Sequence, residues 1–167
     1  MENVNIDNHD ETLLEESSAG KQYFFFKAGG DIYAIEAQYV NEMLEYQHIT
    51  KVPMMPNYIK GVTNIRGDIL AVVDLLERFE LGTTEISKKT ALVIVNDIAL
   101  IIDEVYEVNI IADEDIKASL DFGFKIKQRF ITNMARYTSR DVEEYIAILN
   151  CEEILNIKEL SQIKDLS

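Results

Sequence analysis

Residues 56–75 read P-N-Y-I-K-G-V-T-N-I-R-G-D-I-L-A-V-V-D-L and set an arginine and a glycine between two apolar runs. A glycine after the arginine accepts the left-handed backbone conformation that a tight turn needs. The stretch therefore predicts a β-hairpin in which residues 63–65 pair with residues 69–73 across Arg66 and Gly67. We expect Arg66 to clamp a carboxylate on a neighbouring segment, because a guanidinium offers a fork of donors. A direct contact between Arg66 and a partner protein is compatible with that role.

Two more hairpins are expected on either side of this stretch. Gly29-Gly30 and Asn96-Asp97 tolerate left-handed backbone, and each pair separates two runs rich in β-branched and aromatic residues. The predicted strands are residues 22–27, Asp31–Glu36, Ala91–Val95 and Ile98–Ile102. Because the hairpin recurs, the sequence indicates an internal repeat.

Each repeat is predicted to end in a strand, a cap and a short helix. Asp74 and Asn150 both close an apolar run and precede a glutamate by three residues. In this arrangement the Asx side chain caps the helix while the glutamate reaches back to its start. The second helix is expected to extend over about 151–165.

Short strands with turn signals at this spacing favour small barrels or a sandwich over alternating strands and long helices. We therefore predict a mostly β fold of two similar lobes, near residues 21–83 and 88–157. Barrel closure would remove exposed strand edges, and the lobes could exchange a strand. Residues 1–20 hold several acids, no Lys or Arg and no apolar periodicity, so we expect a disordered acidic tail.

The overall composition excludes several classes of partner. A formal net charge of −14 repels phosphate backbones, so no nucleic acid is expected as a partner. The longest apolar runs have five residues, too few for a membrane span, and no direct membrane insertion is expected. Cys151 is the single cysteine, which fits a reducing compartment. These features predict a soluble cytoplasmic protein.

Catalytic chemistry has little support in the sequence. The chain has two histidines, and neither lies near Cys151 in sequence, although a nucleophile needs a base within reach. The acidic residues 113–115 lack the calcium-loop pattern with its central glycine. No catalytic residue, metal or cofactor is therefore expected. Met54 and Met55, between two prolines, are interpreted either as an adaptable contact surface or as a plug over a barrel end.

Residues 58–75 resemble the CheW family of chemotaxis coupling proteins, whose hallmark is a G-V-x-N-x-R-G turn followed by an apolar strand that ends in D-L. The resemblance extends over roughly residues 21–157. It implies a CheW-like fold of two pseudo-repeated, SH3-like five-stranded β-barrel lobes with short helices, packed around a shared core. It also implies a non-catalytic adaptor that links the cytoplasmic tips of methyl-accepting chemoreceptors to the regulatory domain of a CheA-type histidine kinase.

The resemblance also implies which residues touch the receptor. Val40 and Glu42 match the segment that lines the family's receptor-facing groove. Ile98 and Ala99 match positions opposite, although several members have glycine where Ala99 stands. The family pattern further suggests that Glu42 is the carboxylate that Arg66 clamps.

A second set of residues matches the kinase-contacting end of the family fold. Gly61 and the turn residues Asn64, Arg66 and Gly67 belong to the core motif. Phe122 matches an apolar loop position that some members use in a second kinase contact. The resemblance thus implies two protein contacts on one small domain, at a receptor array in the cytoplasm.

Two alternatives remain at the level of sequence. A paralogue could serve another receptor–kinase pathway, such as one for surface motility or development. A free-standing ligand-binding or enzymatic β-barrel would instead show a deep polar pocket with perturbed titratable groups.

Overall fold

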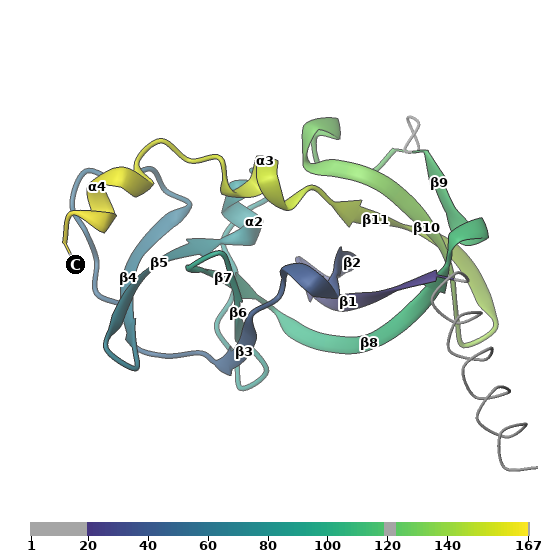
Figure 1. The fold of residues 1–167 in the computed structure, drawn as a ribbon, viewed down its shortest axis with the longest axis horizontal. Helices are drawn as coiled ribbons and strands as arrows, with labels where there is room; N and C mark the ends of the chain where they lie inside the picture. The colour runs from purple at the N-terminus through teal and green to yellow at the C-terminus, as the bar shows by residue number, and fades with distance from the viewer. Residues whose placement is uncertain (1–19, 119–122, 167) are drawn as a thin grey trace, which may run out of the picture.

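The computed structural model describes residues 20–118 and 123–166, and it confirms the mostly β architecture (Figure 1). One sheet has six strands in the order β8-β1-β2-β11-β10-β9, and the other has five in the order β3-β6-β7-β5-β4. The six-stranded sheet consists of β1 (Gly20–Ala28), β2 (Asp31–Glu36), β8 (Glu104–Ala112), β9 (Ile116–Ala118), β10 (Ile131–Ser139) and β11 (Val142–Leu149). The five-stranded sheet consists of β3 (Glu42–Glu45), β4 (Ile59–Ile65), β5 (Asp68–Asp74), β6 (Ala91–Val95) and β7 (Ile98–Ile102).

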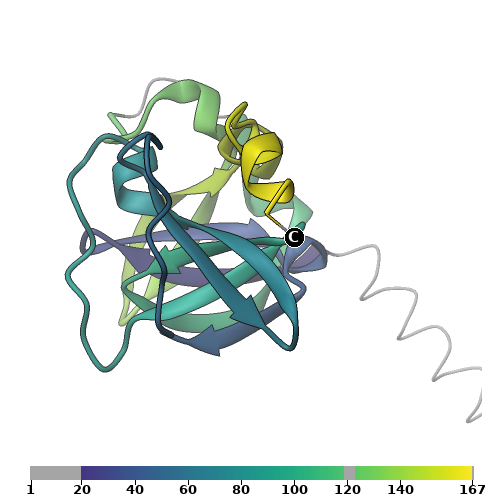
Figure 2. The same ribbon diagram turned by 90° about the vertical axis from the view of Figure 1, so that its left-hand side faces the viewer.

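Short helical segments connect and cover these strands. The α-helices are α2 (Leu75–Arg78), α3 (Cys151–Leu155) and α4 (Leu160–Lys164), and the 3-10 turns are η1 (Ala37–Tyr39), η2 (Asp113–Asp115) and η3 (Gln128–Phe130). Figures 1 and 2 show the two curved sheets as adjacent lobes, with α4 above the five-stranded lobe. The part of the chain that the structure describes contains no helix that is long and apolar enough to cross a membrane.

The three predicted hairpins are present. Arg66 and Gly67 have φ angles of 51° and 91°, and Ile65 pairs with Asp68 across them. The turns between β1 and β2 and between β6 and β7 also have positive φ angles, at Gly29, Gly30, Asn96 and Asp97. Local turn chemistry therefore determined these pairings.

The two sheets do not follow the predicted lobes 21–83 and 88–157. The β1–β2 hairpin pairs with β8 and β11 from the second half of the chain. The β6–β7 hairpin pairs in turn with β3 and β5 from the first half. Each half thus gives its opening hairpin to the sheet of the other half. The exchange that the sequence left open is therefore present and involves whole hairpins, because a hairpin's local sequence does not specify its next neighbour in the sheet.

The exchanged hairpins are buried on both faces. In β1, Phe24 and Phe26 enter a core shared by both lobes, whereas Tyr23 and Phe25 enter the interior of the six-stranded lobe. In β7, the shared core receives Ile98, Leu100 and Ile102, and the interior of the five-stranded lobe receives Ala99 and Ile101. Because successive side chains of a strand point to opposite faces, burial of both faces requires a continuous apolar run.

The helix caps form as predicted. Asp74 Oδ1 accepts from the Leu76 amide at 3.1 Å, and Asn150 Oδ1 accepts from the Glu153 amide at 3.2 Å. Asp74 is buried and also accepts two hydrogen bonds from Thr84, so this cap holds the loop after α2 as well. The two glutamates do not complete the predicted capping boxes: Glu77 pairs with Lys60 and Glu153 with an arginine of η3.

The predicted single helix over 151–165 is instead two helices, α3 and α4. Asn156, after α3, has a ψ angle of 79° and leaves the helical conformation. The carbonyls of Glu153 and Ile154 accept hydrogen bonds from the Arg78 side chain, at 3.0 and 2.9 Å. The last carbonyls of a helix lack later amides as partners, and Arg78 caps this end of α3 together with the Asn156 amide, which also donates to the Glu153 carbonyl.

Gly61 permits a close approach of two backbone segments. Thr50 and Val62 exchange two backbone hydrogen bonds of 2.8 Å, which brings residue 50 beside β4. A Cβ atom added to Gly61 would lie 2.0 Å from the carbonyl oxygen of Thr50, and the φ angle of Gly61 is 143°. A residue with a side chain fits here neither in space nor in backbone conformation.

We expect Gly61→Ala to lower the free energy of unfolding by about 3 kcal/mol or more, since it combines a backbone clash with an unfavourable φ angle. Urea denaturation would measure this loss. Gly67→Ala is the matched control: its φ angle is also positive, at 91°, but no atom lies within 4 Å of the added Cβ. That variant should lose only about 1 kcal/mol. Equal losses in the two variants would contradict the close-approach explanation.

Candidate protein-docking site

The predicted ion pair between Arg66 and Glu42 is present in the structure. An Arg66 Nη2 hydrogen donates to Glu42 Oε1, which joins the β4–β5 turn to β3. β3 and β4 are the two end strands of the five-stranded sheet, so the ion pair connects one end of the strand order to the other. The Arg66 and Glu42 side chains are 68% and 33% exposed. An ion pair with such exposure contributes roughly 0–1 kcal/mol, so its main effect is to orient the turn.

Further hydrogen bonds fix the neighbouring β4–β5 and β6–β7 turns, which form the tips of the five-stranded lobe. Asn64 Oδ1 accepts from the Gly67 amide at 2.9 Å, inside the β4–β5 turn. Asn41 Oδ1 accepts from the Asn96 amide at 3.0 Å, and the Asn41 amide donates to the Ile94 carbonyl. The segment before β3 is therefore tied to the β6–β7 turn, as the ion pair ties β3 to the β4–β5 turn. Three chain segments meet at this end of the lobe.

The residues predicted for a receptor groove differ in their accessibility. Val40 and Glu42 are half-buried, and Val40 packs against the shared core. Ile98 is 7% exposed, and Ala99 is fully buried inside the five-stranded lobe. Because the Ala99 side chain points into that interior, it cannot contact a partner in this conformation.

The predicted kinase-contact residues also fall into two groups. Asn64, Arg66 and Gly67 are exposed at the turn. Gly61 is buried beneath Thr50, so in this structure it allows the backbone of residue 50 to lie close to β4. Phe122 lies outside the described residues.

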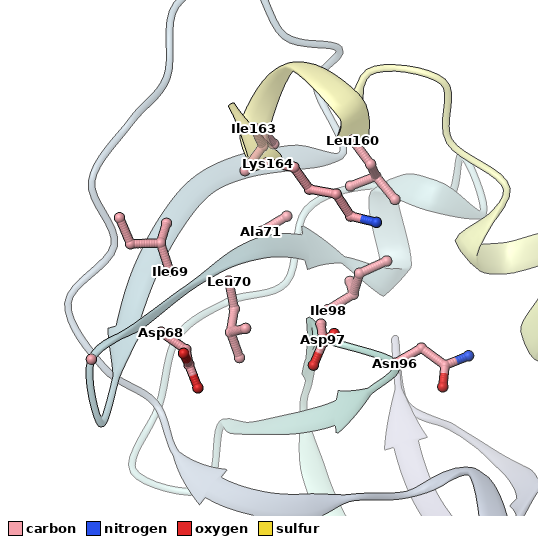
Figure 3. A pocket seen from close by; sticks show the side chains of 11 residues that line it. Asp68, Ile69, Leu70, Ala71, Asn96, Asp97, Ile98, Leu160, Ile163 and Lys164 are labelled. Atoms are coloured by element: carbon pink, nitrogen blue, oxygen red, sulfur yellow. The ribbon is translucent and has the colours of Figure 1, made fainter. Parts of the chain in front are cut away.

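A cleft of about 550 Å³ adjoins these tips (Figure 3). One wall comes from the start of β5, a second from the β6–β7 turn and Ile98, and a third from α4. Ile98 and Gly67, which were predicted for different contacts, therefore share one cleft. The sequence did not predict the cleft, because α4 lies about sixty residues beyond Ile98 and carries no local signal of where it docks.

Arg78 of α2 joins the two lobes, and no local sequence pattern indicated this role. Its guanidinium stacks over the rings of Tyr58 and Phe130, at 4.9 and 5.0 Å, and binds the carbonyls at the end of α3. Burial lowers the pKa of Arg78. A basic residue in the last turn of a helix is common, so only tertiary structure distinguishes this one.

No catalytic arrangement is found among the described residues. His48 is exposed, and Cys151 is buried in the shared core. Within residues 20–118 and 123–166, no three His, Cys, Asp or Glu side chains are placed to hold a metal ion together. The braced turns and the cleft lie together at one end of the five-stranded lobe.

Comparison with known proteins identifies the class more closely. The model of the CheW-like domain family matches residues 22–159, so the chain belongs to this family. The chain is 23% identical over 158 residues to the chemotaxis protein CheW of Klebsiella aerogenes, covering 92% of this chain and 93% of that protein. It is 31% identical over 111 residues to CheW of Bacillus subtilis, covering 64% and 71%.

The fold is similar to a solved structure of the same family. The crystal structure of the scaffolding protein TtCheW from Thermoanaerobacter tengcongensis matches with a TM-score of 0.73 and 28% identity. The match covers 83% of this chain and 94% of that chain. The protein is accordingly a chemotaxis coupling adaptor and not an enzyme.

We expect the Cys151 thiol to be nearly inert in the folded protein. Burial raises its pKa to about 11. At pH 8 the fraction of thiolate is therefore roughly 100-fold lower than for a cysteine with the ordinary pKa. Iodoacetamide labelling followed by mass spectrometry should be at least that much slower in buffer than in concentrated urea. Because the unfolded thiol loses its proton first, stability should also fall as the pH rises from about 9 toward 11. Equal labelling rates in both states would contradict the burial of Cys151.

Proposed function

We propose that this protein couples the cytoplasmic tips of methyl-accepting chemoreceptors to the regulatory domain of a CheA-type histidine kinase. The observation that carries the proposal is the family match over residues 22–159, together with the Arg66–Glu42 brace at the predicted contact end. In this proposal the protein works in the cytoplasm and reaches the membrane through the receptors.

The receptor contact is assigned to the segment of Val40 and Glu42, with Ile98 beside it. The kinase contact is assigned to the exposed turn of Asn64, Arg66 and Gly67. These assignments place the two contacts on adjacent tips of one lobe, joined by the ion pair between Glu42 and Arg66. A receptor that displaces or tightens Glu42 would therefore change the orientation of Arg66, which gives a direct route for coupling.

The test uses the kinase regulatory domain and a soluble receptor-tip fragment encoded in the same genome. Isothermal titration calorimetry should show binding of each to the full chain. We expect Arg66→Ala to weaken binding of at least one of them by about tenfold, which is about 1.4 kcal/mol. The variant should stay folded, since the ion pair is exposed.

Arg136→Ala provides the matched control. Arg136 is also a half-exposed arginine paired with carboxylates, Asp115 and Glu143, but it lies on β10 of the other lobe. Its removal should leave both affinities within about twofold of wild type, as expected for an exposed pair outside the contact. No heat with either partner at tens of micromolar would refute the coupling function. Wild-type affinities for Arg66→Ala would refute the role of the brace.

A further inference from the structure

Helix α4 lies beyond the matched CheW-like domain, which ends at residue 159, and yet it is part of the folded lobe. Ile163 is 3% exposed and enters the shared core, and α4 contacts β5. Leu160 is half-buried and packs against the same core. The segment is therefore built onto the end of the lobe that carries the candidate docking site.

We propose that α4 turns this end of the lobe into a walled cleft that receives an apolar side chain flanked by a lysine or arginine of the receptor. The inference rests on the proposed coupling function and adds a specificity-determining element to it. The cleft, of about 550 Å³, can hold a few side chains and not a whole domain. It therefore fits an anchor residue within a larger contact.

The floor and walls of the cleft supply the apolar part of this recognition. Ala71 and Ile98 face each other in the parallel pairing of β5 and β7, and both line the cleft. Leu160 and Ile163 come from α4 on the opposite side (Figure 3). Ala71, Ile98 and Ile163 are 5%, 7% and 3% exposed, so they form the floor of the cleft, while the half-buried Leu160 and Ile69 offer more accessible apolar surface to an occupant.

The rim of the cleft supplies the charge. Asp68 and Asp97 are exposed carboxylates at the two turns, and the described residues provide neither with a salt-bridge partner. Two such carboxylates favour a basic side chain on the occupant. The net charge of the whole chain, −14, would also steer a basic segment toward the protein. Lys164, on the α4 side, would repel that basic group and so orient it toward the turns.

The cleft is continuous with the segment assigned to the receptor. Asn96, on its rim, is hydrogen-bonded to Asn41, which lies between Val40 and Glu42. Gly67, on the same rim, directly follows the arginine that pairs with Glu42. A receptor segment that covers Val40 and Glu42 would thus extend over the cleft without a gap. This continuity favours the receptor over a small molecule or a second copy of the chain as the occupant.

The experiment compares the full chain with two variants of the cleft. Asp68→Asn with Asp97→Asn removes the acidic rim, and Leu160→Ala shortens the apolar wall. The receptor-tip fragment and the kinase regulatory domain serve as separate probes in calorimetry at two salt concentrations. We expect each variant to weaken receptor binding by about fivefold or more. Leu160→Ala lies on α4, outside the turn assigned to the kinase, and should leave kinase binding within about twofold. The rim variant should also show a weaker salt dependence of receptor binding.

Asp113→Asn with Glu114→Gln is the matched control, because it removes the same charge from exposed acids of η2 on the other lobe. This control should bind the receptor as the wild type does. Wild-type receptor affinity for both cleft variants, or a loss confined to kinase binding, would overturn the inference. If Leu160→Ala unfolds, the receptor affinity of the rim variant alone tests the inference, because the rim substitutions are on the surface and should leave the protein folded. Failure of the wild-type chain to bind the receptor would instead contradict the proposed function.

Discussion

The structure depends on strands that are buried on both faces. The β1–β2 and β6–β7 hairpins each separate the interior of one lobe from a core that both lobes share. Each hairpin belongs to the sheet built mostly from the other half of the chain. Neither lobe can therefore complete its own interior with residues from one half alone. The aromatic run of β1 is needed because an alternating strand would bury polar side chains in one of these two cores.

The docking end of the five-stranded lobe is a product of the same exchange. Asn96 reaches Asn41 because β6 of the second half pairs with β3 of the first. Ile98 lies beside Ala71 because β7 pairs with β5. The cleft and the tied tips thus exist only when both halves of the chain are folded together. Arg78 reinforces this union, since it extends from α2 to the carbonyls of α3 and is held between two aromatic rings.

The sequence predicted the features that local chemistry determines. The three turns, the two Asx caps and the Arg66–Glu42 pair were predictable, the last through the family resemblance. The hairpin exchange was not, because an apolar run fits any sheet that covers both of its faces. The burial of Ala99 followed from that exchange. The end of α3 is capped by Arg78, which is distant in sequence, and α4 is docked through Ile163, which is buried in the shared core. These contacts are tertiary and leave no local pattern.

The central claim, that the two lobes form one structure through a shared core, is tested most directly by native-state hydrogen exchange in increasing urea. We predict that the slowest amides of β1 in one lobe and of β6 in the other open with the same free energy and the same dependence on urea. That result would show a single cooperative unit. Opening of the amides of one lobe at clearly lower urea, while the other lobe stays protected, would contradict the claim.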